Sequence, residues 1–152
     1  MTSSCHDEYG KRNLSDLTAL DNFIRKLSGK ILKHKEDIVR VERDYVGAEV
    51  VLVSYGAVSR AAKTAATRAR EQGLPVGTLR LITPWPFPGE EIEEMARKTK
   101  KVIVLENNLG QLFPYIKAAA DCHAEVSFMP PRVIGEIHDP EAILKKIREV
   151  LS

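Results

Sequence analysis

The sequence predicts an α/β fold in which a five-stranded, mostly parallel sheet is covered by helices on both faces. Two apolar runs, residues 50–53 and 102–105, have the composition of strands buried on both faces. Strand-like and helix-like segments alternate four times from residue 48 onward, which is typical of parallel strands joined by helices. One more strand-like segment precedes them, and too little chain separates it from the next strand for a parallel crossover. We therefore expect the first strand to be antiparallel.

The composition excludes several classes of protein. The 152 residues fit one domain, and 43% hydrophobic with 29% charged residues is typical of soluble globular proteins. A net charge of +2 is too small to indicate a nucleic-acid partner. No apolar run approaches a membrane span and no signal-peptide core follows a basic start, so we expect a cytoplasmic protein without a membrane partner. Cys5 and Cys122 are too few to hold an iron–sulfur cluster alone, and their spacing leaves a disulfide open.

The amino-terminal part is expected to lie outside the core of the domain. Residues 1–14 are polar and predict a tail or linker, in which the adjacent His6 and Asp7 make a poor metal chelate. Residues 15–36 predict an amphipathic helix, N-capped by Ser15, that leads into an α/β domain of residues 37–152. Its apolar positions alternate in three- and four-residue steps and are expected to pack on the domain or on a partner chain. They are Leu17, Leu20, Ile24, Leu27 and Ile31.

The elements of the domain follow from their patterns in order. Alternating residues over 39–45 predict an edge strand, and the buried strand 48–55 is followed by an alanine-faced helix that ends at Gly73. Strand 76–82 precedes a helix whose first turns carry glutamates, which suit the helix dipole. Strand 102–105 is followed by a helix from about Gly110 to Asp121. Strand 125–129 precedes a last helix, with Asp139 as its cap and Pro140 at its first position.

The loops after these strands are the place where we expect function. In open α/β sheets, ligands and partners usually bind at the carboxyl edge of the parallel strands. The prolines of residues 84–88 hold Trp85 and Phe87 on a stiff extended loop. These two rings either contact a partner or cover the end of the core, and the sequence leaves both open. The residues predicted to form this interface or ligand edge are Tyr55, Gly56, Pro84, Trp85, Pro86, Phe87, Glu106, Asn107, Asn108, Gly110 and Gln111.

Three segments together resemble the carboxyl-terminal part of the α subunit of 2-oxoacid:ferredoxin oxidoreductases, specifically those of the 2-oxoglutarate type. They are residues 53–56, 81–88 and 106–112, which read VSYG, LITPWPFP and ENNLGQL. Residues 6–10, HDEYG, are similar to the segment that precedes this domain in those subunits. The resemblance covers nearly the whole chain. It implies a three-layer α/β/α fold similar to the carboxyl-terminal domain of transketolase.

The resemblance also implies a reaction and its participants. Such enzymes decarboxylate a 2-oxoacid, form an acyl-CoA and reduce ferredoxin, using thiamine diphosphate, Mg²⁺ and iron–sulfur clusters in the complete assembly with a β subunit. This chain departs from the complete subunit because it lacks a GDG-type diphosphate motif and cluster-binding cysteines. We therefore expect no cofactor and no catalytic residue here. The expected role is a scaffold and subunit interface, in a fragment, an expressed domain or a small paralogue that is inactive alone.

Two other hypotheses stand beside this one. In the first, the same edge binds a small anionic ligand such as coenzyme A through amides near Gly56 and Gly110, with Arg132 nearby. In the second, the chain is an enzyme by itself, with Glu106 or His138 as general base or with a thiolate–imidazole pair of Cys122 and His123. The sequence shows no evident nucleophile for either base, and adjacent residues rarely point toward each other.

Overall fold

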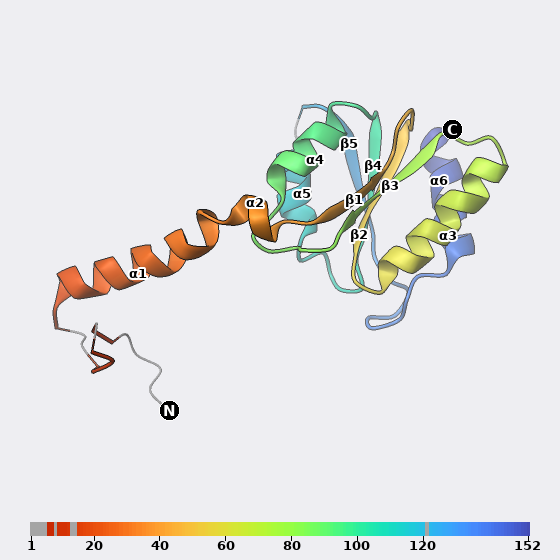
Figure 1. Ribbon diagram of the computed structural model, residues 1–152. Coiled ribbons are helices and arrows are strands. Elements are labelled where there is room, and N and C mark those ends of the chain that lie inside the picture. The colour runs from red at the N-terminus through yellow and green to blue at the C-terminus, as the bar shows by residue number, and fades with distance from the viewer. Residues whose placement is uncertain (1–5, 8, 13–14, 121) are drawn as a thin grey trace. The chain divides into compact units, whose positions relative to one another are not determined.

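A computed structural model describes residues 6–7, 9–12, 15–120 and 122–152. The chain divides into two compact units, Met1–Ile38 and Val39–Ser152, so the division falls two residues after the domain start expected at 37. The second unit contains the whole sheet (Figure 1). Among the described residues, no helix is both long and apolar enough to cross a membrane.

The first unit contains the predicted amphipathic helix in a shorter form. Helix α1 spans Leu17–Leu32, and a separate turn of helix, α2, spans Lys35–Ile38. The predicted cap Ser15 was wrong, because the Asp16 carboxylate accepts hydrogen bonds from Thr18 N and Ala19 N at 3.0 and 3.1 Å. A carboxylate suits this position because it also interacts with the positive end of the helix dipole. Helix α1 ends where His34 N donates to Ile31 O, the tighter bond that often closes a last turn.

The second unit has the predicted five-stranded mixed sheet. Its strands are β1 (Val41–Asp44), β2 (Val50–Tyr55), β3 (Val76–Leu81), β4 (Lys101–Leu105) and β5 (Glu125–Met129). They lie in the order β1-β3-β2-β4-β5. Strand β1 pairs antiparallel with β3, whereas the other neighbours are parallel, so the predicted antiparallel first strand is confirmed.

Four helices cover the sheet in two layers (Figure 1). Helices α3 (Val58–Glu71) and α6 (Pro140–Leu151) pack on one face, and α4 (Gly89–Ala96) and α5 (Phe113–Ala119) pack on the other. The core between the sheet and helices α3 and α6 is called here the first core, and the core between the sheet and helices α4 and α5 the second core. In β4, Ile103 and Leu105 belong to the first core, and Val102 and Val104 belong to the second. Side chains alternate across a strand, so residues 102–105 of this interior strand are all apolar because both of its faces are buried there. The predicted three-layer arrangement is confirmed.

Several local expectations can be scored against the structure. The alanine face of α3 is buried as predicted, and Gly73 follows its end with φ of 76°. Asp139 caps α6 by accepting from Glu141 N at 3.1 Å, also as predicted. The predicted start of α5 was wrong. The helix begins at Phe113 rather than at Gly110, because the residues between them belong to a turn in which the Asn108 side chain accepts hydrogen bonds from the backbone. The predicted end at Asp121 lies outside the described residues.

Candidate functional site

The strand order places two of the predicted loops beside each other at the carboxyl edge. The chain passes from β2 to β3 on one side of β2 and then returns to β4 on its other side. This reversal between β2 and β4 is the switch point where open α/β sheets usually bind ligands. Tyr55 ends β2 and Glu106 follows β4, so both side chains lie at that point.

Glu106 is buried there and is fully engaged by three donors. Its side chain is 1% exposed. Oε1 accepts from Phe113 N at 2.7 Å, while Oε2 accepts from Leu112 N and from the Tyr55 hydroxyl, both at 3.0 Å. The carboxylate thus satisfies amides at the start of α5, a favourable position for negative charge. A substrate proton cannot reach these oxygens, so the geometry argues against Glu106 as a general base.

Asn108 fixes the turn that separates β4 from α5. Its Oδ1 accepts from Gly110 N at 2.8 Å and from Gln111 N at 2.9 Å, and its Nδ2 donates to the Tyr55 hydroxyl at 2.8 Å. Gly110 has φ of 90°, a conformation that glycine adopts without strain. The turn is therefore held from inside by an asparagine side chain, as in other Asx turns.

Tyr55 joins the two loops through its hydroxyl group. Burial raises the pKa of Tyr55 above its ordinary value of 10.0, the hydrogen bond and the charge of Glu106 raise it further, and the bond from Asn108 lowers it. Tyr55 is therefore a neutral donor to Glu106 at physiological pH. Tyr55, Glu106 and Asn108, called here the edge network, form a rigid base under the carboxyl-edge loops.

The proline–aromatic loop places its two rings in different environments. Phe87 is half-buried and packs against the second core, with its ring centroid 5.9 Å from that of Tyr115. Trp85 is 71% exposed, although Pro86 beside it is buried and the bond between them is cis. Phe87 therefore covers the core, whereas Trp85 is presented to the solvent. Pro84 is half-buried beside it.

The loop after β4 presents a second exposed apolar side chain. Leu109 is 78% exposed and sits on the turn that Asn108 holds. It was missed among the predicted edge residues, although a leucine between an asparagine and a glycine in a turn was a visible signal. Asn107 Oδ1 is buried and has no hydrogen-bond partner within the described part of the chain. Gln111 is exposed, and Gly56 accepts a bond from Ser59 N at 3.3 Å.

The remaining candidates do not join the edge network. Arg132 is exposed and pairs with Glu136 at 2.8 Å. His138 is buried, and its Nε2 lies 3.0 Å from Met129 O. This hydrogen bond to the end of β5 gives His138 a structural role. Cys122 and His123 are both exposed in the turn after α5, where Cys122 has φ of 64°. Cys5 lies outside the described residues.

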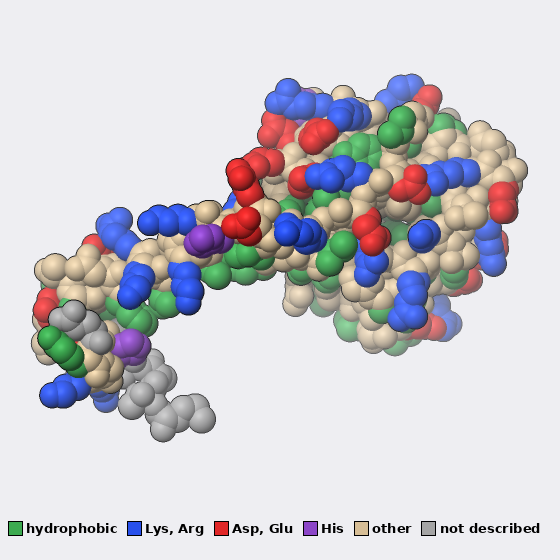
Figure 2. Space-filling view, in the orientation of Figure 1, with side chains coloured by type: hydrophobic (Ala, Val, Ile, Leu, Met, Phe, Trp, Pro, Cys, Tyr) green, Lys and Arg blue, Asp and Glu red, His purple; other side chains and the backbone are tan. Residues whose placement is uncertain are grey.

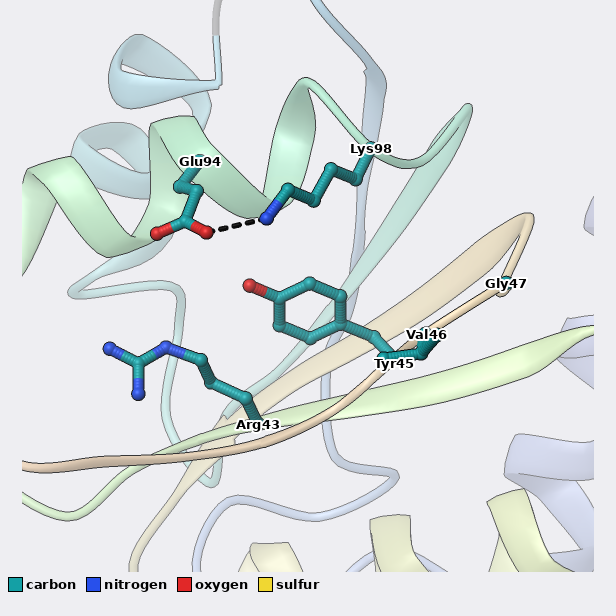
Figure 3. Close-up of a pocket in the computed structure, with 6 residues that line it drawn as sticks. All are labelled: Arg43, Tyr45, Val46, Gly47, Glu94 and Lys98. Carbon is teal, nitrogen blue, oxygen red and sulfur yellow. Dashed lines mark hydrogen bonds and ion pairs between the residues drawn. The ribbon is translucent and has the colours of Figure 1, made fainter.

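The opposite edge of the sheet, where the parallel strands begin, is called here the amino edge. It carries a pocket of about 420 Å³ (Figure 3). Tyr45 lies between Arg43 and the ion pair of Glu94 with Lys98, in which Lys98 Nζ is 2.5 Å from Glu94 Oε1. Arg43 in turn donates to Glu91 at 2.8 Å, and this bond is the main cause of its raised pKa. Both cations in the pocket are thus neutralised by carboxylates of α4. This pocket has the character of a surface ion-pair cluster.

The residues present do not fit the iron–sulfur clusters or the metal ion that the family resemblance implies. An iron–sulfur cluster takes four cysteine ligands, and the sequence has two cysteines. Among the described residues, no group of three or more His, Cys, Asp or Glu side chains is placed to hold a metal ion. His6 and Asp7 are no exception, since the Asp7 carboxylate accepts backbone bonds from Tyr9 and Lys11. No chemical step of a cofactor is therefore assigned to this chain.

Comparison with known proteins places this geometry in a family. The family described as pyruvate:ferredoxin oxidoreductase core domain II matches residues 48–143. The 2-oxoglutarate synthase subunit KorA of Methanothermobacter marburgensis is 40% identical over 148 residues, which are 97% of this chain and 39% of KorA. The chain thus spans about two fifths of the length of this curated relative.

Two solved structures share the fold. The 2-oxoglutarate:ferredoxin oxidoreductase from Magnetococcus marinus, solved with 2-oxoglutarate, coenzyme A and succinyl-CoA bound, superimposes with a TM-score of 0.78 at 25% identity, covering 99% of this chain and 26% of that chain. A split-gene transketolase, solved as an inactive tetramer of four beta subunits, gives a TM-score of 0.60 at 19% identity and covers 74% of this chain and 41% of that chain. The predicted likeness to the transketolase fold is confirmed, and the chain belongs to the pyruvate:ferredoxin oxidoreductase core domain II family.

Proposed function

We propose that the chain is the carboxyl-terminal domain of the α subunit of a 2-oxoacid:ferredoxin oxidoreductase of the 2-oxoglutarate type. Family membership and the 40% identity to KorA support this role. The complete enzyme would hold thiamine diphosphate, Mg²⁺ and iron–sulfur clusters in its other domains and subunits, and would use coenzyme A and ferredoxin. Without those parts, the chain does not catalyse the reaction.

Within this assembly, the carboxyl edge serves as a docking surface for neighbouring domains or the β subunit. The observation that carries this proposal is the pair of exposed apolar side chains, Trp85 and Leu109, on loops that the buried edge network and core packing hold in place. Rigid aromatic and aliphatic anchors lose little conformational entropy on binding. A partner donor facing the buried oxygen of Asn107 would also relieve its missing hydrogen bond.

The docking role is tested by assembly with the β subunit and with the part of the α subunit that this chain does not span, called here the companion α-subunit domain. Sedimentation velocity would compare the wild-type chain with a Trp85→Ser/Leu109→Ser variant. We expect the double variant to bind at least about tenfold more weakly, since anchor residues dominate interface energy. Val46→Ser is the matched control, because Val46 is fully exposed in the turn before β2, at the other edge of the sheet. Equal weakening by the control, or none by the double variant, would refute the docking role.

The substrate class is tested in the reconstituted enzyme. With the chain, its companion subunits, coenzyme A and ferredoxin present, 2-oxoglutarate is expected to support faster ferredoxin reduction than pyruvate or a branched 2-oxoacid. A clear preference for another 2-oxoacid would reject the 2-oxoglutarate type while leaving the family intact. Omitting the chain should abolish activity if it completes the α subunit.

A second candidate function is binding of coenzyme A by this chain itself. It is favoured by the start of α3, where no side chain among the described residues caps the helix at Ala57. The amides of Gly110 and Gln111 argue against it, because Asn108 already occupies them. Titration of the chain with coenzyme A, followed by amide chemical shifts, separates the two candidates. Shifts at residues 56–59 would support ligand binding, and unchanged shifts there would exclude it.

A further inference from the structure

Tyr55 connects the end of β2 to a turn that lies 53 positions further along the chain. Its hydroxyl oxygen is 3.0 Å from Glu106 Oε2 and 2.8 Å from Asn108 Nδ2. Glu106 is 1% exposed, and the other two side chains are half-buried. All three residues belong to the second unit, so the edge network is internal to one compact unit.

The proton of the Tyr55 hydroxyl group is directed at Glu106. A carboxylate has no hydrogen to donate, and Glu106 also accepts from Leu112 N and Phe113 N. Tyr55 is therefore the donor in its bond with Glu106. Burial, followed by the hydrogen bond from Tyr55 to Glu106, raises the pKa of Tyr55 above 10.0, so the hydroxyl group keeps its proton at physiological pH. Since a hydroxyl group has one hydrogen, its oxygen can only accept from Asn108.

This polarity decides which way the Asn108 amide points. Its NH₂ group must face Tyr55, because only that end of the amide is a donor. The amide oxygen then faces the turn, where it accepts from Gly110 N at 2.8 Å and from Gln111 N at 2.9 Å. The opposite orientation would set NH₂ against two backbone donors and the amide oxygen against the Tyr55 oxygen. The buried carboxylate thus orients, through Tyr55, the side chain that holds the turn.

Leu109 lies on this turn. It is 78% exposed and is one of the two apolar side chains assigned to the docking surface. On the face of the second unit that Figure 2 shows, basic and acidic side chains are interspersed, so charge gives an approaching partner little orientation there. Affinity then depends on how well the apolar anchors are preorganised, because ordering a loop on binding costs free energy.

We propose that Tyr55 is a positioning residue of the docking surface, which acts through Asn108 to fix the turn of Leu109 in the conformation that a partner binds. The inference rests on the proposed function and adds to it a residue that acts without touching the partner. One hydroxyl group at the end of β2 thus controls how strongly the loop after β4 binds.

The test is a double-mutant cycle of Tyr55→Phe and Asn108→Ala in the full chain. Isothermal titration measures binding to the companion α-subunit domain and the β subunit, and amide hydrogen exchange of the free chain is followed over residues 109–112. We expect Tyr55→Phe to weaken binding about fivefold, because the turn must then be ordered on binding. The same variant should speed exchange in the turn.

The second background separates positioning from general support of the fold. With Asn108→Ala present, Tyr55→Phe should change neither binding nor exchange further, because the residue through which it acts is gone. Tyr45→Phe removes the same atom at the amino edge and is the matched control, which should bind as the wild type does. Circular dichroism would establish that each variant is folded under the conditions of the titration.

Two results overturn the inference. The first is unchanged binding, or unchanged exchange in the turn, for Tyr55→Phe. The second is an equal loss from Tyr55→Phe with and without Asn108→Ala, because Tyr55 would then act by another route. If Trp85→Ser/Leu109→Ser leaves binding unchanged, the docking role itself fails. If that variant weakens binding while Tyr55→Phe does not, the proposed function stands and this inference alone fails.

Discussion

The two edges of the sheet use the same residue types in opposite ways. At the carboxyl edge, Glu106 is buried and accepts from two amides and from Tyr55. At the amino edge, Glu94 is exposed and pairs with Lys98 near Tyr45. The first arrangement fixes two loops, because buried donors without acceptors would lower the stability of the fold. Exposed ion pairs contribute little to stability. At the carboxyl edge, loops held by buried hydrogen bonds therefore present exposed apolar side chains.

The largest effect that tests this contrast is loss of the buried carboxylate. Glu106→Ala is expected to lower the free energy of unfolding by about 3 kcal/mol, because it strands two amides and one hydroxyl group. Glu106→Gln retains one acceptor and should lower it by about half as much. Urea unfolding followed by circular dichroism measures both. Glu94→Ala is the control and should leave the transition unchanged, and an equal loss there would break the contrast.

At the amino edge, backbone packing rather than charge should dominate stability. A Cβ at Gly77 would lie 2.5 Å from Tyr45 Cα and 2.8 Å from Asp44 O, so Gly77→Ala forces the backbone to move. We expect a loss of about 2 kcal/mol in the free energy of unfolding, as for other overpacked sites. Gly29→Ala in α1 is the control, since its Cβ would meet only Lys33 Cε at 3.9 Å. Its added helix propensity should make it neutral or stabilising.

The turn held by Asn108 should respond more mildly. Asn108→Ala removes acceptors from Gly110 N and Gln111 N, which solvent can partly replace in this exposed loop. We expect about 1 kcal/mol lower stability together with faster hydrogen exchange at residues 108–112. Unaltered exchange in this loop would show that Asn108 does not hold the turn.

The smallest effect concerns alkaline pH. Burial, followed by Glu106 at one edge and Glu94 at the other, raises the pKa of Tyr55 and of Tyr45 above 10.0. Both therefore keep their protons in the folded chain where the unfolded chain has lost them. Their contribution to stability is complete below pH 10 and is lost as the pH rises above it. Tyr45→Phe/Tyr55→Phe should fall less steeply in stability between about pH 9.5 and 11. A slope equal to that of the wild type would contradict both shifts.

The sequence could predict the fold because periodicity reflects burial directly. Residues 50–53 and 102–105 lack alternation because each strand has helices on both faces, and the repeated strand–helix units require parallel pairing. The hydrogen bond from Tyr55 to Glu106 could not be predicted from the sequence. It depends on β2 lying beside β4, and the pattern of apolar residues does not determine the order of strands. The start of α5 was missed because the side chain of Asn108 competes with the helix for backbone amides.

The docking role of the carboxyl edge has a direct spectroscopic test. Trp85 is the single tryptophan of the sequence, so incorporating 5-fluorotryptophan into this chain alone gives one ¹⁹F resonance at the proposed surface. The resonance would be recorded for the free chain and after addition of the companion α-subunit domain and the β subunit. The account predicts a changed shift and a loss of its sensitivity to D₂O, as the ring leaves solvent. An unchanged, solvent-sensitive resonance in a complex that sedimentation shows to be assembled would contradict it.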